Sequence, residues 1–164
     1  MLSNSFFTKL PKILIAIVLK AMALFLLFAC NIENKKLIIY NNEDKVLASY
    51  DMKKNDYFSI EFMHSVNMSK VIEYYRFDDK NNIYVYKTVY YNYGAGVETE
   101  LENDETMRFG EDGSMIIENI NKEIPNLTYY LSSIFDHTLR INDGAPISLW
   151  EICGKNKIIS FKIN

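Results

Sequence analysis

Residues 57–77 read YFSIEFMHSVNMSKVIEYYRF. In the first part of this stretch Phe58, Ile60 and Phe62 alternate with other side chains, which is the pattern of a β-strand with one buried face. His64 continues that face at the end of the apolar stripe. After a short connection, a second run of β-branched and aromatic residues follows. The two runs predict an antiparallel hairpin at the centre of a β protein.

The same rhythm continues outward from this hairpin in both directions. Runs of β-branched and aromatic residues recur roughly every ten residues, and clusters of Asn, Asp, Gly and Lys separate them. Helical periodicity is nearly absent. We therefore expect an all-β fold, a single antiparallel sandwich or barrel-like domain of about ten strands joined as a meander of hairpins. The expected strands are 36–40, 46–50, 57–64, 70–77, 83–93, 115–120, 127–131, 138–141, 147–151 and 158–163.

One segment leaves its secondary structure open. The stretch 127–135 (LTYYLSSIF) follows Pro125 and Asn126. Asn126 has the side chain of a helix cap, and several apolar residues of the stretch fall at helical spacing. A strand over 127–131 is the preferred interpretation, and a short helix is the alternative.

The first thirty residues differ from the rest of the chain. They contain lysines at positions 9, 12 and 20 and no acidic residue, and residues 21–28 (AMALFLLF) are uninterruptedly apolar. A positively charged segment followed by a short apolar one is the layout of a secretion signal. Lys20 interrupts the longer apolar stretch 13–32, which is therefore a poor match to a membrane-spanning helix. We expect the chain to be exported.

The apolar segment ends in residues 27–30 (LFAC), which resemble the bacterial lipobox. In that motif a small residue precedes a cysteine that receives a lipid and becomes the mature N-terminus. We expect lipidation at Cys30, with an uncleaved signal anchor and ordinary signal cleavage as alternatives. In every case residues 1–30 form the signal or anchor, 31–35 a short link, and 36–164 a domain in the cell envelope, on the outer side of a bacterial membrane.

The exported domain is acidic. Without the three lysines of the leader, the chain has 15 basic and 21 acidic residues, which is a net charge of −6. A domain of this charge does not attract phosphate backbones, and the sequence contains no local basic stripe. We therefore expect the membrane as a partner and no nucleic acid.

Three residues of the central hairpin are candidates for chemistry. His64 ends an apolar stripe, where a histidine is either a structural residue bonded to backbone or a ligand. Ser65 follows it in the strand and so points to the other face, which separates a nucleophile from its base. Glu73 lies in an apolar strand and needs a partner, and the hairpin register decides whether it shares the face of His64. We predict no catalytic residue.

A metal site is not predicted either. His64, Glu73 and His137 offer the donor types that zinc takes, but their spacing is not compact, and the chain has only these two histidines. The acidic residues of 98–105 lack the spacing of a calcium loop and are expected to form a solvated edge. We expect no cofactor.

A glycine turn follows the longest expected strand. Tyr93, Gly94, Ala95 and Gly96 suit a bulge or a positive-φ turn, in which backbone N–H groups can approach a ligand. The turn lacks the strand-to-helix context of a nucleotide-binding loop. It is interpreted as a strand-ending turn or as part of a ligand surface.

Together these motifs resemble a known protein family. The segments 62–66 (FMHSV), 93–96 (YGAG) and 137–139 (HTL), with Glu73, resemble those of a bacterial family of small exported proteins of unknown function. The resemblance extends over about residues 57–150. Members are usually encoded beside genes of tripartite ATP-independent periplasmic (TRAP) transporters, of the class whose solute receptor is called TAXI. The resemblance implies an association with solute uptake and no established activity.

We therefore expect a membrane-tethered, non-enzymatic accessory protein that contacts a TRAP permease or its solute receptor. A small-molecule or metal-binding envelope domain that uses His64 and Glu73 is the alternative, and a hydrolase that uses the same pair is the least favoured hypothesis. The expected ligand or partner surface consists of His64, Ser65, Glu73, Tyr93, Gly94, Ala95, Gly96 and His137.

Overall fold

The computed structural model describes residues 14–20, 35–66, 68–92, 100–102 and 104–164. The chain divides into two units, Met1–Glu33 and Asn34–Asn164. In the first unit, residues 14–20 form a helix whose apolar side chains are exposed. Among the described residues, no helix has both the length and the apolar character needed to cross a bilayer. Cys30 and the lipobox-like segment lie outside the described residues.

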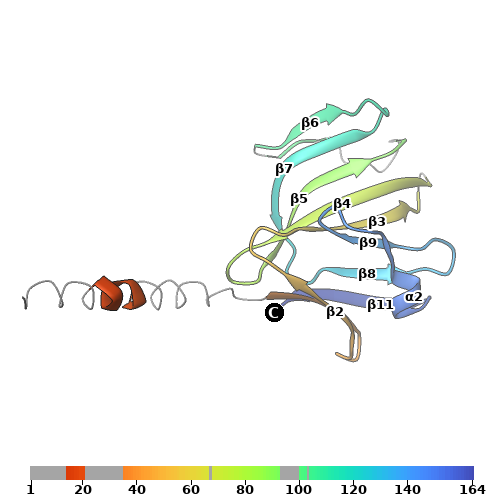
Figure 1. The fold of residues 1–164 in the computed structure, drawn as a ribbon. Helices are drawn as coiled ribbons and strands as arrows, with labels where there is room; N and C mark the ends of the chain where they lie inside the picture. Colours follow the sequence, from red (N-terminus) through yellow and green to blue (C-terminus); the bar gives the residue numbers. More distant parts are fainter. Residues whose placement is uncertain (1–13, 21–34, 67, 93–99, 103) are drawn as a thin grey trace, which may run out of the picture. The chain divides into compact units, whose positions relative to one another are not determined.

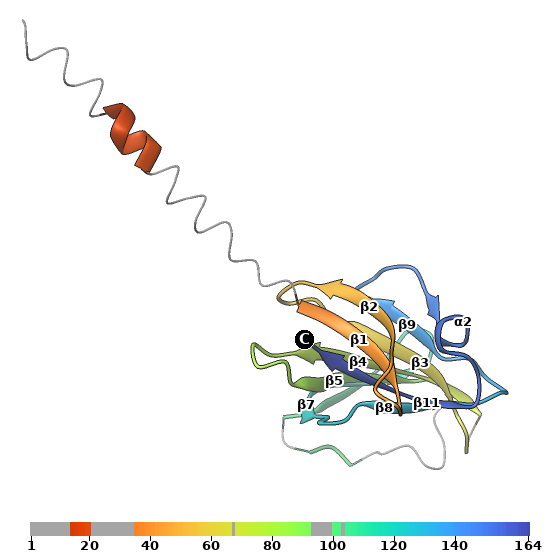
Figure 2. The ribbon, with the colours of Figure 1, turned by 90° about the horizontal axis from the view of Figure 1, so that it is seen from below.

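The second unit is built from two antiparallel sheets (Figure 1). The smaller sheet brings the two ends of the domain together, because the first strand pairs with the last, with Leu37 opposite Ile163. Figure 2 shows this arrangement from below. The expected meander is therefore wrong for this sheet. Its strands, in spatial order, are β2 (Val46–Met52), β1 (Lys35–Asn41), β11 (Lys157–Ile163) and β8 (Thr128–Leu131).

The larger sheet has seven strands and contains the central hairpin. Three consecutive strands, β3, β4 and β5, lie side by side in it as expected, whereas β9 reaches the far side of β3 from a distant part of the chain. The strands in spatial order are β10 (Ile147–Ser148), β9 (Thr138–Ile141), β3 (Phe58–His64), β4 (Ser69–Phe77), β5 (Ile83–Tyr90), β7 (Met115–Glu123) and β6 (Thr106–Phe109).

The core lies between the two sheets. Phe58 of β3 stacks on Phe161 of β11 with ring centroids 6.1 Å apart, and on Tyr75 of β4 at 5.1 Å. Leu37 and Ile39 of β1 are fully buried in the same cluster. Each large apolar side chain buried in this way contributes about 1.5–3 kcal/mol to stability. The all-β sandwich expected from the sequence is confirmed.

The predicted strand 147–151 is wrong beyond its second residue. Strand β10 stops at Ser148, and helix α2 (Leu149–Cys153) follows. The Ser148 side chain accepts a hydrogen bond from the Glu151 N–H at 3.2 Å, which is a helix N-cap. Ser and Glu at this spacing form a capping pattern that outweighs the apolar run.

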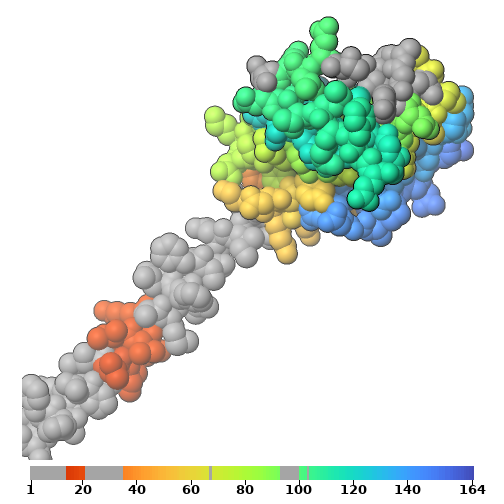
Figure 3. All heavy atoms as spheres, turned by 90° about the horizontal axis from the view of Figure 1, so that it is seen from above, coloured from red at the N-terminus to blue at the C-terminus, as the bar shows by residue number. Residues whose placement is uncertain are grey.

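The other differences between the predicted and the observed strands are smaller. The segment 127–135 contains the strand β8, as preferred, and not the alternative helix. The predicted strand 83–93 ends at Tyr90 instead. Strand β6 was not predicted, because it is only four residues long, although Met107 and Phe109 alternate with polar residues in it. Figure 3 shows the side chains of β6 and β7 at the near surface of the domain.

Candidate functional site

A groove of about 460 Å³ lies at the end of β3. It is bounded by the last residues of β3, by the turn that follows them, by Tyr130 of β8 and by the segment 132–137. We call it the histidine groove, because His64 and His137 both line it. Aromatic and sulfur-containing side chains form most of the rest of its wall: Phe62, Met63, Met68 and Phe135.

Helix α2 fixes the backbone next to His137. The Asp136 carboxylate accepts hydrogen bonds from the Trp150 N–H at 3.0 Å and from the Ser148 hydroxyl at 2.5 Å. The Leu149 N–H donates to the His137 carbonyl at 2.9 Å. These hydrogen bonds hold the backbone at His137 in place, which favours a defined orientation of the His137 ring.

The His137 ring is buried among aromatic rings. It stacks on Phe62 with centroids 5.9 Å apart and meets the edge of Tyr129 at 5.6 Å. Only 8% of the residue is exposed. Burial lowers the pKa of His137, and the nearby Asp136 opposes this shift in part. The ring is therefore held mainly in its neutral form near pH 7.

Both histidines of the groove have an unpaired nitrogen. The Nδ1 atoms of His64 and of His137 are buried and have no hydrogen-bond partner. A buried polar atom without a partner costs about 1–3 kcal/mol, so native structures avoid the situation unless something else uses the atom. Two such atoms at one groove make it a candidate binding site.

Glu73 forms its hydrogen bonds with two tyrosines and not with the histidines of the groove. In the observed register Ile60 lies opposite Glu73, which places the carboxylate on the inward face of β4, the face that His64 shares. There it accepts hydrogen bonds from the hydroxyls of Tyr75, at 2.7 Å, and of Tyr129. The two hydroxyls also lie 2.7 Å from each other. We call these three residues the tyrosine clamp.

The tyrosine clamp depends on protonated phenols. Burial raises the pKa of both Tyr75 and Tyr129, and the adjacent Glu73 carboxylate raises it further. Both hydroxyls therefore remain donors at any physiological pH. Both hydroxyls bond the same carboxylate oxygen, Oε2, and hold it without a histidine.

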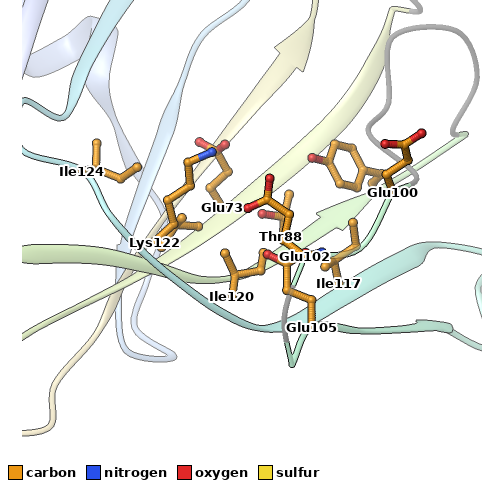
Figure 4. A pocket seen from close by; sticks show the side chains of 11 residues that line it. Glu73, Thr88, Glu100, Glu102, Glu105, Ile117, Ile120, Lys122 and Ile124 are labelled. Atoms are coloured by element: carbon orange, nitrogen blue, oxygen red, sulfur yellow. The ribbon is translucent and has the colours of Figure 1, made fainter.

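A second cavity, of about 190 Å³, lies on the other side of Glu73. Figure 4 shows Glu102, Glu105 and Lys122 around it, with Glu73 at its inner end. The acidic segment therefore borders a cavity instead of forming only a solvated edge. Among the described residues, however, no group of three His, Cys, Asp or Glu side chains is placed to hold a metal ion.

The structure thus brings together only part of the expected surface. His64, Ser65 and His137 line one groove, whereas Glu73 belongs to the tyrosine clamp. Tyr129 connects the two regions, because its ring contacts His137 and its hydroxyl bonds Glu73. The other expected surface residues, Tyr93, Gly94, Ala95 and Gly96, lie outside the described residues.

The expected surface omitted two kinds of residue. Tyr129 is one, although the preferred strand 127–131 already placed it on one face with Leu127 and Leu131, which are buried. The other kind is the exposed apolar residue beside the groove. Val66 and Ile134 are 68% and 73% exposed, and Met68 and Tyr130 are similarly exposed. We call these four residues the apolar rim.

Part of the β domain matches a known protein family. The family described as Domain of unknown function (DUF1850) matches residues 58–147. No curated protein and no solved structure matches the chain. The matched stretch extends from β3 to the start of β10 and includes both histidines and Glu73. This chain belongs to the DUF1850 family, whose function is unknown.

Proposed function

We propose that this chain is a non-catalytic accessory protein of a TRAP-type solute transporter. Its N-terminal segment holds it at the outer side of a bacterial membrane, and its apolar rim and histidine groove contact the permease or the solute receptor. The link to a transporter rests on the resemblance of the FMHSV and YGAG segments, and the contact surface rests on the apolar rim.

The exposure of the apolar rim is the observation that carries the proposal. Val66 and Ile134 are more than two-thirds exposed. Ile134 lines the groove, whose wall is largely apolar, and Val66 follows the lining residue Ser65 in the chain. Apolar side chains scattered singly over a surface are ordinary, but a group around a concave site is typical of a surface that binds another molecule. A partner that covers the rim would remove these side chains from water.

The surroundings of the hairpin residues favour binding over hydrolysis. Among the described residues, no hydrogen bond joins His64 to Ser65 or to Glu73, and Glu73 is engaged by two tyrosines. A hydrolase needs its nucleophile or water oriented by a base within hydrogen-bond reach. The same residues serve a binding surface without such an arrangement.

Tethering gives the proposed contact an advantage. A domain joined to a membrane anchor by a link of about five residues stays close to any protein in the same membrane, so its effective concentration there is high. A weak contact through the apolar rim is then sufficient. The anchor and the groove are two parts of one proposed mechanism.

The test is co-purification of the full chain with the neighbouring permease and receptor in mild detergent. The double variant Val66→Asp, Ile134→Asp should lose the association, because it places charges in the proposed contact. Val46→Asp is the matched control, because Val46 is also exposed, at 54%, but lies in β2 of the other sheet. Surface changes of this kind alter stability little.

The proposal is wrong if the wild-type chain captures neither protein, or if the rim variant captures them as well as the control does. Circular dichroism of each variant establishes that a loss of capture does not come from unfolding.

A ligand-binding envelope domain is the second candidate. The unpaired Nδ1 atoms of His64 and His137 favour it, because they are buried donors or acceptors at a groove. In this form of the hypothesis His137 replaces Glu73 as the companion of His64. Thermal shift of the full chain measures it, since a ligand at a hundredfold over its Kd adds about 2.7 kcal/mol of stability.

A further inference from the structure

We infer that the histidine groove is a binding site for monovalent copper, held by imidazole nitrogens of His64 and His137 and by the thioether sulfur of Met68. The inference deepens the ligand-binding candidate described above and does not depend on the transporter partner. It uses only residues that line the groove.

The two imidazoles lie on one face of the sheet, close to each other. Glu61 pairs with Thr138, so the next position of the pairing sets His137 beside Phe62, and the two rings stack. His64 follows Phe62 by two residues and therefore shares its face, about 6.7 Å further along the strand. Diagonal neighbours across two strands are separated by about 7–8 Å between their Cα atoms. Both rings line the same groove, and we place the ion between them.

The surroundings of the imidazoles suit a metal ion better than an anion. None of the described residues that line the groove is a lysine or an arginine, which would attract a carboxylate or phosphate. Imidazole binds metals through the lone pair of a ring nitrogen. Each ring also keeps a buried Nδ1 without a protein partner.

The identity of the third donor selects the metal. Zinc in proteins takes cysteine, histidine and carboxylate ligands, and the described residues contain no group of three such side chains in position. The sulfur donor that the groove does offer is a methionine thioether, from Met68 in the turn and from Met63 in β3. Thioether sulfur is a soft donor and favours Cu(I).

The backbone of Met68 is an independent sign that its side chain matters. Met68 has a φ of 51°, in the left-handed region. The seven other described non-glycine residues with positive φ are all Asn or Asp, which tolerate that region through local hydrogen bonds. A methionine gains nothing locally from it. Residues held in such conformations cluster at functional sites.

The test is a titration of the detergent-solubilised full chain with Cu(I), kept reduced by ascorbate without oxygen, against the coloured competitor bicinchoninate. The wild-type chain should withdraw a single equivalent of Cu(I). His64→Phe and His137→Phe should abolish this binding. Met68→Leu should weaken it by at least about tenfold, whereas Met107→Leu, which removes an exposed methionine in β6, should not change it.

Met68→Asn is the more demanding variant. It removes the sulfur and supplies a residue that suits a φ of 51°, so copper affinity should fall while the unfolding temperature stays the same or rises. Loss of copper binding in a variant that is at least as stable as the wild type cannot come from misfolding.

Two results would overturn the inference: no withdrawal of Cu(I) by the wild-type chain, or equal affinity in wild type and Met68→Leu. The outcome is separable from the transporter proposal. Val66→Asp alone should keep copper while it weakens capture of the partner, because Val66 is not among the described residues that line the groove. If the wild-type chain withdraws no Cu(I) and the rim variant still loses the partner, the copper site is wrong and the accessory role stands.

Discussion

Glu73 and His137 are both polar residues on the inner face of the same sheet, yet their surroundings are opposite. The carboxylate of Glu73 accepts two tyrosine hydroxyls within the tyrosine clamp. The imidazole of His137 keeps a buried nitrogen with no partner. Tyr129 contacts both residues, so a single side chain separates the bonded carboxylate from the unpaired imidazole nitrogen.

The difference in hydrogen bonding between Glu73 and His137 suggests different roles for the two residues. Oε2 of Glu73 accepts both tyrosine hydroxyls within the fold, which stabilises a unique packing. The Glu73 side chain also lines the cavity that Glu102 and Lys122 border. A buried polar atom without a partner destabilises the fold and persists where another requirement holds it. We therefore propose that the two tyrosine hydroxyls serve folding and that the histidine groove serves binding.

Removing the residue that connects the two regions should have the largest effect. Tyr129→Ala should lower the free energy of unfolding by about 3 kcal/mol, because it deletes a ring packed against Phe62, His137 and Phe161. Tyr129→Phe keeps the ring and removes one donor to Glu73, and should lose about 1–2 kcal/mol. Urea unfolding monitored by circular dichroism measures both.

Tyr130→Phe is the control for the hydroxyl, because this neighbour is 58% exposed and its hydroxyl is far less constrained. It should change stability by less than about 0.5 kcal/mol. If Tyr129→Phe is equally neutral, Glu73 does not need its second tyrosine, and the contrast with His137 loses its basis.

The histidine should respond to pH. Burial lowers the pKa of folded His137 below its ordinary value of 6.5, so the unfolded chain binds the proton more tightly. The wild-type chain should therefore lose stability as the pH falls from about 7 to about 5, through the unfolded pKa towards the folded one. His137→Phe should reduce this loss, because no proton is then taken up at this position on unfolding.

At pH 7 the same variant should be about as stable as the wild type or slightly more so, because it removes a buried unpaired nitrogen. Urea unfolding at several pH values measures the slope. An unchanged slope in His137→Phe would show that the histidine titrates alike in the folded and unfolded chains.

The strands of the central hairpin were predictable because their alternation is strict. The face of Glu73 relative to His64 was not, since a shift of one residue in register reverses it. The structure sets His64 opposite Ser69. This register places the side chains of His64 and Glu73 on the same, inner face of the sheet. The length of the turn decides the register, and the sequence pattern does not specify how that turn closes.

The companion of His64 was harder to predict. His137 reaches the groove because β9 pairs with β3 across more than seventy residues of chain, and no local pattern encodes such a pairing. The partner of Glu73 is likewise remote, since Tyr129 lies 56 residues away. By contrast, helix α2 had a local signal in Ser148 and Glu151, which the apolar run around them obscured.

The smallest expected effect tests whether the left-handed backbone of Met68 lowers the stability of the fold. Met68→Asn should raise the free energy of unfolding by about 1 kcal/mol, because the left-handed backbone disfavours residues other than Gly, Asn and Asp by about 1–2 kcal/mol. Asn55→Met is the mirror control, because Asn55 is exposed with a φ of 73°, and it should lose a similar amount. If Met68→Asn destabilises while Asn55→Met behaves as expected, the side chain of Met68 stabilises the fold by packing in the groove. The methionine would then be structural, and the distinction between the tyrosine clamp and the groove would rest on the histidines alone.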